Sequence, residues 1–180
     1  MLLVIMILML VVSLIVLFLS VSVVTGIFIT KVPFVSSQKK SFKSSMEVAG
    51  LKPGELLIDL GCGKAHHLIY ADKKLGARCV GYELSLWPYL WSKFNILVWK
   101  SKARVYFKDF FKADISQADV IYCYLFPEIM DKLEPKFKKE LKPGARVVSY
   151  GFKMSKAIAE KIEITNENKP NLGKIYLYKY

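Results

Sequence analysis

Two acidic residues and two glycines have the spacing of a ligand-binding turn. The stretch "LLIDLGCGKA" places Asp59 two positions before Gly61, and Gly63 follows after one residue. Both glycines tolerate backbone angles closed to other residues, and neither has a side chain that would keep a ligand away from the peptide groups. Glu83 ends the next apolar stretch, within "ARCVGYEL". These residues predict a pocket that combines accessible backbone with two carboxylates.

Asp59 determines which class of ligand fits this turn. Its carboxylate repels a pyrophosphate, which the N-terminus of a following helix would otherwise attract. The dinucleotide fingerprint also fails, because His66 stands at the sixth position of "GCGKAH", where a small residue is required. A ligand with an ammonium group suits the carboxylate, and S-adenosylmethionine carries one together with a ribose that Glu83 is placed to bind. The alternative for Glu83 is a strand end that merely faces solvent.

Alternating strands and helices must position these residues. Because the strands are joined through helices, the pattern predicts an α/β fold, a Rossmann-like seven-strand sheet with helices on both faces. A short amphipathic helix with Phe42 and Met46 on its apolar face precedes the sheet and ends at Gly50. The expected strands are 56–60, 77–84, 103–107, 118–126, 145–152, 157–165 and 173–180, and the expected helices between them are 64–75, 86–99 and 127–141.

The first thirty residues contain no charged side chain and exceed the roughly 20 apolar residues needed to cross a bilayer. The sequence therefore predicts one N-terminal transmembrane helix over residues 1–30, a linker and short helix over 31–50, and a catalytic domain over 51–180. Lys31, Lys39 and Lys40 follow the span, so the basic-flank rule predicts a single-pass protein with its catalytic domain on the cytoplasmic side. The lipid bilayer is thus an expected partner.

Charge and cysteine content limit the other partners. The chain has 27 basic and 15 acidic residues and a net charge of +12, which favours anionic partners such as phospholipid headgroups. We expect no nucleic acid partner, because no dense basic cluster marks a binding groove. The three cysteines are scattered among apolar neighbours, which is typical of reduced thiols, and no zinc-binding spacing is present.

The motifs together resemble class I (seven-strand) S-adenosylmethionine-dependent methyltransferases. More narrowly, they are similar to archaeal protein-lysine methyltransferases and to the ATP synthase c-subunit lysine N-methyltransferase family. The resemblance covers almost all of residues 33–180. It is carried by "VPFVSS", "LLIDLGCGKA", "VGYELSLWPYLWSKF", the stretch from "KDFF" to "VVSYGF", and "GKIYLYKY".

The resemblance implies a role for each matching residue. Asp59, Gly61 and Gly63 would hold the methionine end of the cofactor, and Glu83 its ribose. Asp109 and Phe110 would hold the adenine, and Pro33 with Phe34 would form part of a lid. Tyr124 matches the motif beside the transferred methyl group, and Phe126 is the second catalytic candidate. For the aromatic residues, and for Tyr122, the alternative is core packing.

The chain departs from the family pattern in the glycine turn. Lys64 and Ala65 stand where an acid and a third glycine are usual, so the positive charge and the added methyl group are expected to weaken cofactor binding. His66 and His67 are adjacent, so their side chains point about 100 degrees apart on a helix and do not share a metal easily. We expect no metal site.

Three functions fit the sequence. The first is a membrane-anchored protein-lysine N-methyltransferase, whose anchor would keep membrane-embedded proteins within reach of the site. The second is a methyltransferase that acts on a lipid or quinone, and the third is a non-catalytic membrane-bound scaffold with a degenerate cofactor turn. For the first, a lysine with a solution pKa near about 10.4 must lose a proton before it attacks. Desolvation in an aromatic channel lined by Tyr124 and Phe126 would favour the neutral amine.

Overall fold

A seven-stranded sheet forms the centre of the domain. The structure, a computed structural model, describes residues 1–30, 39–165 and 173–180. The strand order is β3-β2-β1-β4-β5-β7-β6, with β7 antiparallel to both of its neighbours and the first five strands in the order parallel. The strands are β1 (Leu56–Leu60), β2 (Arg78–Glu83), β3 (Arg104–Phe107), β4 (Val120–Cys123), β5 (Arg146–Tyr150), β6 (Lys161–Ile164) and β7 (Lys174–Lys179).

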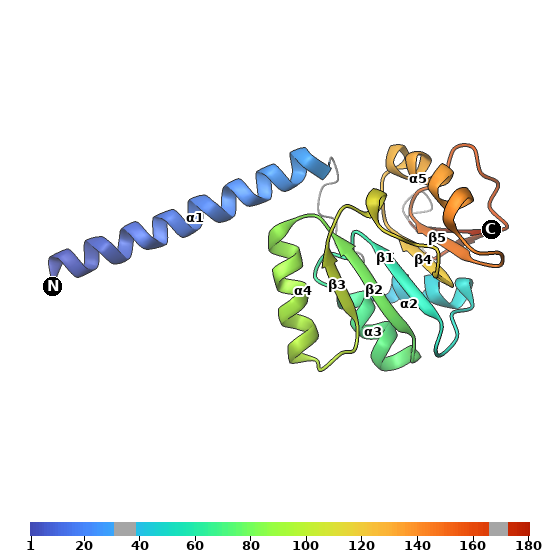
Figure 1. The fold of residues 1–180 in the computed structure, drawn as a ribbon, viewed down its shortest axis with the longest axis horizontal. Helices are drawn as coiled ribbons and strands as arrows, with labels where there is room; N and C mark the ends of the chain where they lie inside the picture. The colour runs from blue at the N-terminus through green and yellow to red at the C-terminus, as the bar shows by residue number, and fades with distance from the viewer. Residues whose placement is uncertain (31–38, 166–172) are drawn as a thin grey trace.

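Helices cover both faces of this sheet, as the alternating pattern predicts (Figure 1). One face packs against residues of α2, α3 and α4, and the other against α5 together with the segment after β3. The helices are α1 (Leu2–Thr30), α2 (Lys39–Ala49), α3 (His66–Leu75), α4 (Leu86–Val98) and α5 (Pro127–Glu140), with a short 3₁₀ helix η1 (Phe110–Lys112). The expected fold class and element order are confirmed.

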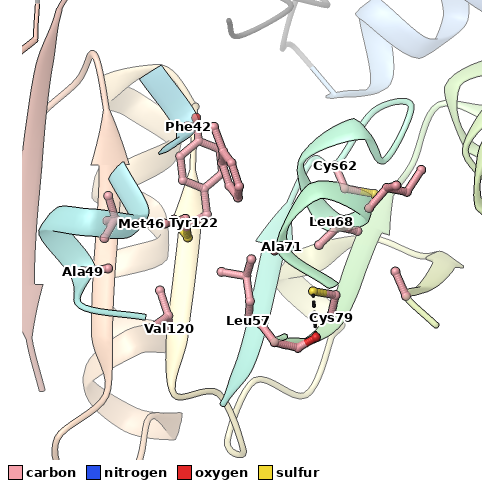
Figure 2. Close-up of a cluster of buried hydrophobic side chains, with 14 of the residues drawn as sticks. Phe42, Met46, Ala49, Leu57, Cys62, Leu68, Ala71, Cys79, Val120 and Tyr122 are labelled. Atoms are coloured by element: carbon pink, nitrogen blue, oxygen red, sulfur yellow. Dashed lines mark hydrogen bonds between the residues drawn. The ribbon is translucent and has the colours of Figure 1, made fainter. Parts of the chain in front are cut away.

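The short helix α2 forms where the sequence predicts it and covers the sheet with the expected side chains. Phe42 and Met46 are buried against the central strands, and Phe42 meets the ring of Tyr122 edge-on at 5.0 Å (Figure 2). Arg146 of β5 holds the end of α2, because its guanidinium donates hydrogen bonds to the carbonyl oxygens of Ala49 and Gly50 at 2.7 and 2.8 Å. The end of α2 is thereby fixed at the start of β5.

The first helix, α1, is apolar along its whole length and leaves the domain on the side of α4 (Figure 1). The apolar side chains described along it, from Leu2 to Val21, are exposed. Within the residues that the structure describes, no helix combines the length and apolarity of a membrane span. The helix predicted over residues 1–30 is therefore present, and its membrane insertion stays a prediction.

Gly81 of β2 allows the turn after β1 to pack directly on the sheet. A β-carbon added at this position would lie 2.6 Å from the Cys62 sulfur, 2.8 Å from the Cys62 Cβ and 2.6 Å from a methyl group of Leu68. Cys62 and Leu68 belong to the same buried cluster, beside β2 (Figure 2). A side chain at position 81 would therefore displace the turn that carries Gly61 and Gly63.

We predict that Gly81→Ala lowers the free energy of unfolding by about 1–3 kcal/mol, the usual cost of overfilling a packed core. Chemical denaturation followed by circular dichroism measures this change. Adding Leu68→Ala to the same chain removes one of the two clashing groups. The free energy of unfolding should therefore fall by less in the double variant than the two single variants lose together. A Gly81→Ala protein as stable as the wild type would contradict this close approach.

Candidate functional site

The carboxyl ends of the parallel strands form the edge at which the predicted site residues meet. The strand register places four residues in one row along this edge: Glu83, Gly61, Tyr124 and Tyr150. The connections from β1 and β4 run in opposite directions along the sheet, which is where ligands bind in folds of this type. Acidic residues thus lie on the β1–β2 side of the row and aromatic residues on the β4–β5 side.

The turn after β1 adopts the backbone angles that its glycines allow. Gly61 and Gly63 have φ values of +83° and +53°, in the left-handed region that glycine tolerates best. The peptide N–H groups of Gly61 and Cys62 donate to the Tyr82 carbonyl oxygen, so the turn is fixed to β2. Ala65 occupies the third left-handed position with φ +61° and is fully buried. The departure from glycine therefore keeps the backbone path of the turn.

Asp59 lies beneath this turn and is buried, with 3% of its surface exposed. Burial raises the pKa of its carboxyl group to about 8, and the nearby Glu83 carboxylate adds to the increase. Within the described ranges 1–30, 39–165 and 173–180, the Asp59 side chain makes no hydrogen bond. A buried carboxyl group in this state gains most from a ligand that brings a positive charge.

Glu83 ends β2 and is held firmly in place. One oxygen of its carboxylate accepts a hydrogen bond from the Gly63 N–H at 2.9 Å, and the other accepts from the Ser85 N–H at 2.7 Å. The side chain is buried, with 8% of its surface exposed, so it does not simply face solvent at a strand end. Each carboxylate oxygen can accept a second hydrogen bond. The geometry therefore leaves acceptor capacity for a pair of hydroxyl groups.

These two acids and the turn between them fit the cofactor that the sequence predicts. S-adenosylmethionine presents an ammonium group for the buried carboxyl group of Asp59 and two ribose hydroxyls for Glu83. Peptide groups of the turn at Gly61 and Gly63 have no side chain in front of them. The predicted roles of these four residues are thus compatible with one another.

Lys64, directly after the glycine turn, has an aromatic partner in α4. Its ammonium group lies over the ring of Trp91 in α4, 5.5 Å from the ring centroid. A cation over an aromatic face is stabilised there, and Trp is the best partner for such a contact. The expectation that Lys64 weakens cofactor binding stays a prediction.

The adenine-binding candidates lie at the end of the neighbouring strand. Asp109 follows β3, and its carboxylate accepts a hydrogen bond from the Phe111 N–H at 2.9 Å, which caps η1. Phe110 is half-buried, with its ring centroid 5.0 Å from that of Phe111. Both candidates stand on the Glu83 side of the row, and their contact with adenine stays a prediction. Pro33 and Phe34, the lid candidates, lie outside the described residues.

Four aromatic rings gather on the other side of the row. Tyr124 lies 5.2 Å from Tyr150 and 6.2 Å from Phe152 between ring centroids, and Phe126 lies 5.3 Å from Phe152. All four are half-buried, and we call Tyr124, Phe126, Tyr150 and Phe152 the aromatic cluster. Burial raises the pKa of Tyr124, so its hydroxyl stays protonated near neutral pH. The cluster forms an apolar surface beside the turn.

Sequence reasoning identified only half of this cluster. Tyr150 ends β5, and Phe152 follows two residues later in "SYGF". Their place beside Tyr124 depends on the parallel pairing of β4 with β5, which no local signal in the sequence gives. Ser41 of α2 donates a hydrogen bond to the Tyr150 hydroxyl oxygen at 2.9 Å, so α2 is connected to the cluster. Tyr122, which has the same strand-face parity as Tyr124, is 1% exposed and belongs to the core.

The two histidines are separated as their spacing predicts. His66 is exposed, whereas His67 stacks on Phe42 with 4.3 Å between ring centroids. Within the residues described, no group of three or more His, Cys, Asp or Glu side chains could hold a metal ion. The three cysteines are buried thiols without disulfides, and burial raises the pKa of Cys79 to about 12.

Comparison with known proteins identifies the family. The family description "ANTKMT methyltransferase domain" matches residues 59–161, more than half of the chain. This chain belongs to that family. The match begins at Asp59 and contains the glycine turn, Glu83 and the aromatic cluster. The expected S-adenosylmethionine-dependent methyltransferase is thereby confirmed as the class of this ANTKMT-type domain, and S-adenosylmethionine as its class of cofactor.

Individual relatives agree with this family. A protein-lysine N-methyltransferase of Saccharolobus islandicus is 32% identical over 71% of this chain and 81% of its own length. The human lysine N-methyltransferase of the ATP synthase c-subunit is 32% identical over 67% of this chain. The chain spans about half the length of that human relative and of its mouse counterpart.

A solved structure agrees with the fold as well. An RNA methyltransferase from Salinibacter ruber, in complex with S-adenosyl-L-homocysteine, superimposes with a TM-score of 0.75. Its sequence is 28% identical, and the match covers 81% of this chain and 93% of that one.

The raised pKa of Asp59 predicts a change in bound protons when the cofactor product S-adenosylhomocysteine binds. Near pH 7 most Asp59 carboxyl groups are protonated, and the amino-acid amine of the ligand is charged. Because the complex needs a carboxylate and an ammonium group, binding should release most of one proton. Near pH 9 most Asp59 carboxyl groups are already ionised, so this proton release should largely disappear. Titration calorimetry in buffers of different ionisation enthalpy measures both quantities.

Asp59→Asn is the matched control. It should bind the ligand more weakly and release no proton near pH 7. The folded-state pKa of Asp59 lies above its ordinary value of 3.8, so its contribution to stability is complete below pH 4 and is lost as the pH rises toward about 8. The Asn variant should therefore gain melting temperature relative to the wild type across that window. Equal proton release by both proteins would refute the assignment of Asp59.

Proposed function

We propose that this protein transfers a methyl group from S-adenosylmethionine to a lysine side chain of another protein. The observation that carries this proposal is the half-buried aromatic cluster beside the buried acids. Aromatic faces attract a lysine ammonium group, and an apolar surface lowers the pKa of that group once water leaves. The identity of 32% with the Saccharolobus protein-lysine N-methyltransferase supports the same class of substrate.

The residues of this chain mainly have to bind and orient the two reactants. S-adenosylmethionine, when bound, supplies a methyl group activated by the positive charge of its sulfur. Asp59 and Glu83 hold the two ends of that cofactor at one side of the row, and Tyr124 directs the substrate amine from the other. Alignment of this kind provides much of the rate in a displacement at carbon. A dedicated general base is not required, because desolvation in the aromatic cluster favours the neutral amine.

We further propose that α1 attaches the domain to a membrane, with the domain on the cytoplasmic side. The exposed apolar side chains from Leu2 to Val21 have no polar face to present to water. A domain held at a membrane meets membrane-embedded proteins at a high effective concentration. A membrane-embedded substrate protein is therefore the partner that we favour, by analogy with the human relative named for the ATP synthase c-subunit.

Two other methyl acceptors, RNA and a lipid or quinone, are alternatives to lysine. The Salinibacter structure is described as an RNA methyltransferase, which makes RNA a testable acceptor. Membrane attachment would also bring the site close to a lipid or quinone. We favour lysine over both because the aromatic cluster suits a cation, whereas the row offers no basic side chain for a phosphate backbone.

The full chain, incubated with radiolabelled S-adenosylmethionine and a membrane extract, should label protein at lysine. Tyr124→Ala should lower kcat/KM for the protein substrate by about tenfold, the ratio that corresponds to a cation–π contact of about 1.4 kcal/mol. It should leave the affinity for S-adenosylhomocysteine almost unchanged. Scintillation counting of gel bands and peptide mass spectrometry measure the product.

Tyr106→Phe, an exposed aromatic on the edge strand β3, is the control for this assay and should keep full activity. Label that is recovered in RNA, or in the organic phase after alkaline treatment, would assign a different acceptor. If the Tyr124→Ala variant transferred the methyl group at the wild-type rate, the assignment of the aromatic cluster to the substrate site would be wrong.

Membrane attachment through α1 has its own test. After alkaline carbonate extraction, the wild-type chain should stay with the membrane pellet. Replacing both Leu8 and Val12 with Asp should move it into the supernatant, because each buried charge costs about 2.5–3.5 kcal/mol at the centre of a bilayer helix. Ile162→Asp, on an exposed strand, should not change the distribution. Release of the wild-type chain by carbonate would contradict the attachment.

A further inference from the structure

Helix α4 has its polar and apolar faces reversed relative to a helix on the surface of a soluble domain. The residues that it buries are Ser92 and Asn95. The side chain of Ser92 donates to the Tyr89 carbonyl oxygen, and the side-chain amide of Asn95 donates to the Lys64 carbonyl oxygen at 3.0 Å. Hydrogen bonds of this kind satisfy the polar groups that face the domain. Tyr89 and Ile96 pack against the domain, whereas most other apolar residues of α4 face outward.

The outward face of α4 is large and continuous. Its positions recur at spacings of three and four residues, so they form one stripe along the helix. We call this stripe the α4 face, and its exposed members are Trp87, Leu90, Trp91, Phe94, Leu97 and Val98. Leu97 is 76% exposed, and Trp99, directly after the helix, is 62% exposed. Folded soluble proteins rarely leave an apolar patch of this kind in contact with water.

The surroundings of the α4 face match the interface of a bilayer that contains anionic lipid. All three tryptophans of the chain lie on α4 or directly after it, and tryptophan is enriched where headgroups meet acyl chains. Residues 84–113, which include α4 and the neighbouring strand β3, contain exposed basic side chains and one acid, Asp109. The basic residues are Lys93, Lys100, Lys102, Arg104, Lys108 and Lys112. Such a surface complements negatively charged headgroups.

The position of α1 also favours a lipid bilayer as the partner of the α4 face. α1 leaves the domain on the side of α4, and the two helices are in contact (Figure 1). An apolar helix and an apolar helix face that lie on one side of the domain can both enter a single bilayer. A second copy of the chain would cover the α4 face, but it would place two positively charged surfaces against each other.

We propose that α4 lies on a bilayer surface containing anionic phospholipid, with the α4 face inserted at the boundary of headgroups and acyl chains. Asn95 joins α4 to the glycine turn through Lys64, and Ser85 before α4 binds Glu83. Contact with the bilayer would thus orient the carboxyl edge of the sheet relative to the membrane. This inference rests on the surface of α4 and does not depend on lysine as the acceptor.

Tryptophan fluorescence of the full chain tests the proposal directly. Because every tryptophan lies at α4, the emission reports on this helix and not on α1. In vesicles of phosphatidylcholine and phosphatidylglycerol, we expect emission at shorter wavelength than for the same chain kept in solution by an amphipathic polymer. A spin label near the lipid headgroup should quench the emission more than a label at the end of the acyl chain, since interfacial helices lie about 5–10 Å deep.

Two variants separate this contact from attachment through α1. Phe94→Glu with Leu97→Glu should reduce the quenching by about half or more, because the charges oppose insertion of the α4 face. The same variant should still resist carbonate extraction through α1 and should still bind S-adenosylhomocysteine, which shows that the domain is folded. Ile158→Glu, at a position that is 94% exposed and distant from α4 in sequence, is the matched control and should retain wild-type quenching.

Several outcomes would overturn the proposal. In the first, α1 keeps the chain bound to the vesicles, but the lipid spin labels do not quench the tryptophan emission. Equal quenching in vesicles of phosphatidylcholine alone would refute the role of anionic lipid. Unquenched tryptophans together with cross-links between Leu97→Cys positions of two chains would assign the α4 face to self-association. None of these results changes the outcome of the lysine-labelling assay, so the two proposals fail independently.

Discussion

The buried carboxyl group of Asp59 is the constraint on which the site depends. A carboxyl group loses hydration when it is placed under a packed turn, and the neighbouring Glu83 makes ionisation harder still. The fold tolerates this arrangement because the sheet fixes both acids on adjacent strands and the peptide N–H of Gly63 holds Glu83 in place. A positive ligand group relieves the cost, so affinity for an ammonium group is built into the position of this side chain.

The side chains along the carboxyl edge of the sheet are acidic at β2 and β1 and aromatic after β4 and β5. Glu83 and Asp59 belong to β2 and β1, whereas the aromatic cluster follows β4 and β5. In the proposed function, one side of the row would hold a charged cofactor and the other would exclude water around a substrate amine. The connection of α2 to Tyr150 through Ser41 places a further element at the aromatic side.

The exposed side chains of α1 and α4 show that the hydrophobic effect is not satisfied within this chain alone. α4 covers part of the sheet with Ile96, yet it directs Phe94 and Leu97 outward and turns Asn95 inward. Folded proteins rarely leave such a pattern in contact with water, and larger exposed apolar patches mark interaction sites. The same helix meets the glycine turn through Lys64, so the surface and the site are parts of one structural unit.

The sequence by itself determined the order of strands and helices, since apolar periodicity and turn residues are local properties. It also predicted Asp59, Gly61 and Glu83 as neighbours at one site, because their chemistry and spacing follow from one turn and the end of the next strand. Tertiary structure alone decided which aromatic residues meet: Tyr122 enters the core, whereas Tyr150 joins Tyr124 at the edge. It also decided which face of α4 points outward. Strand register and helix rotation depend on contacts between distant segments, and the local pattern does not encode those contacts.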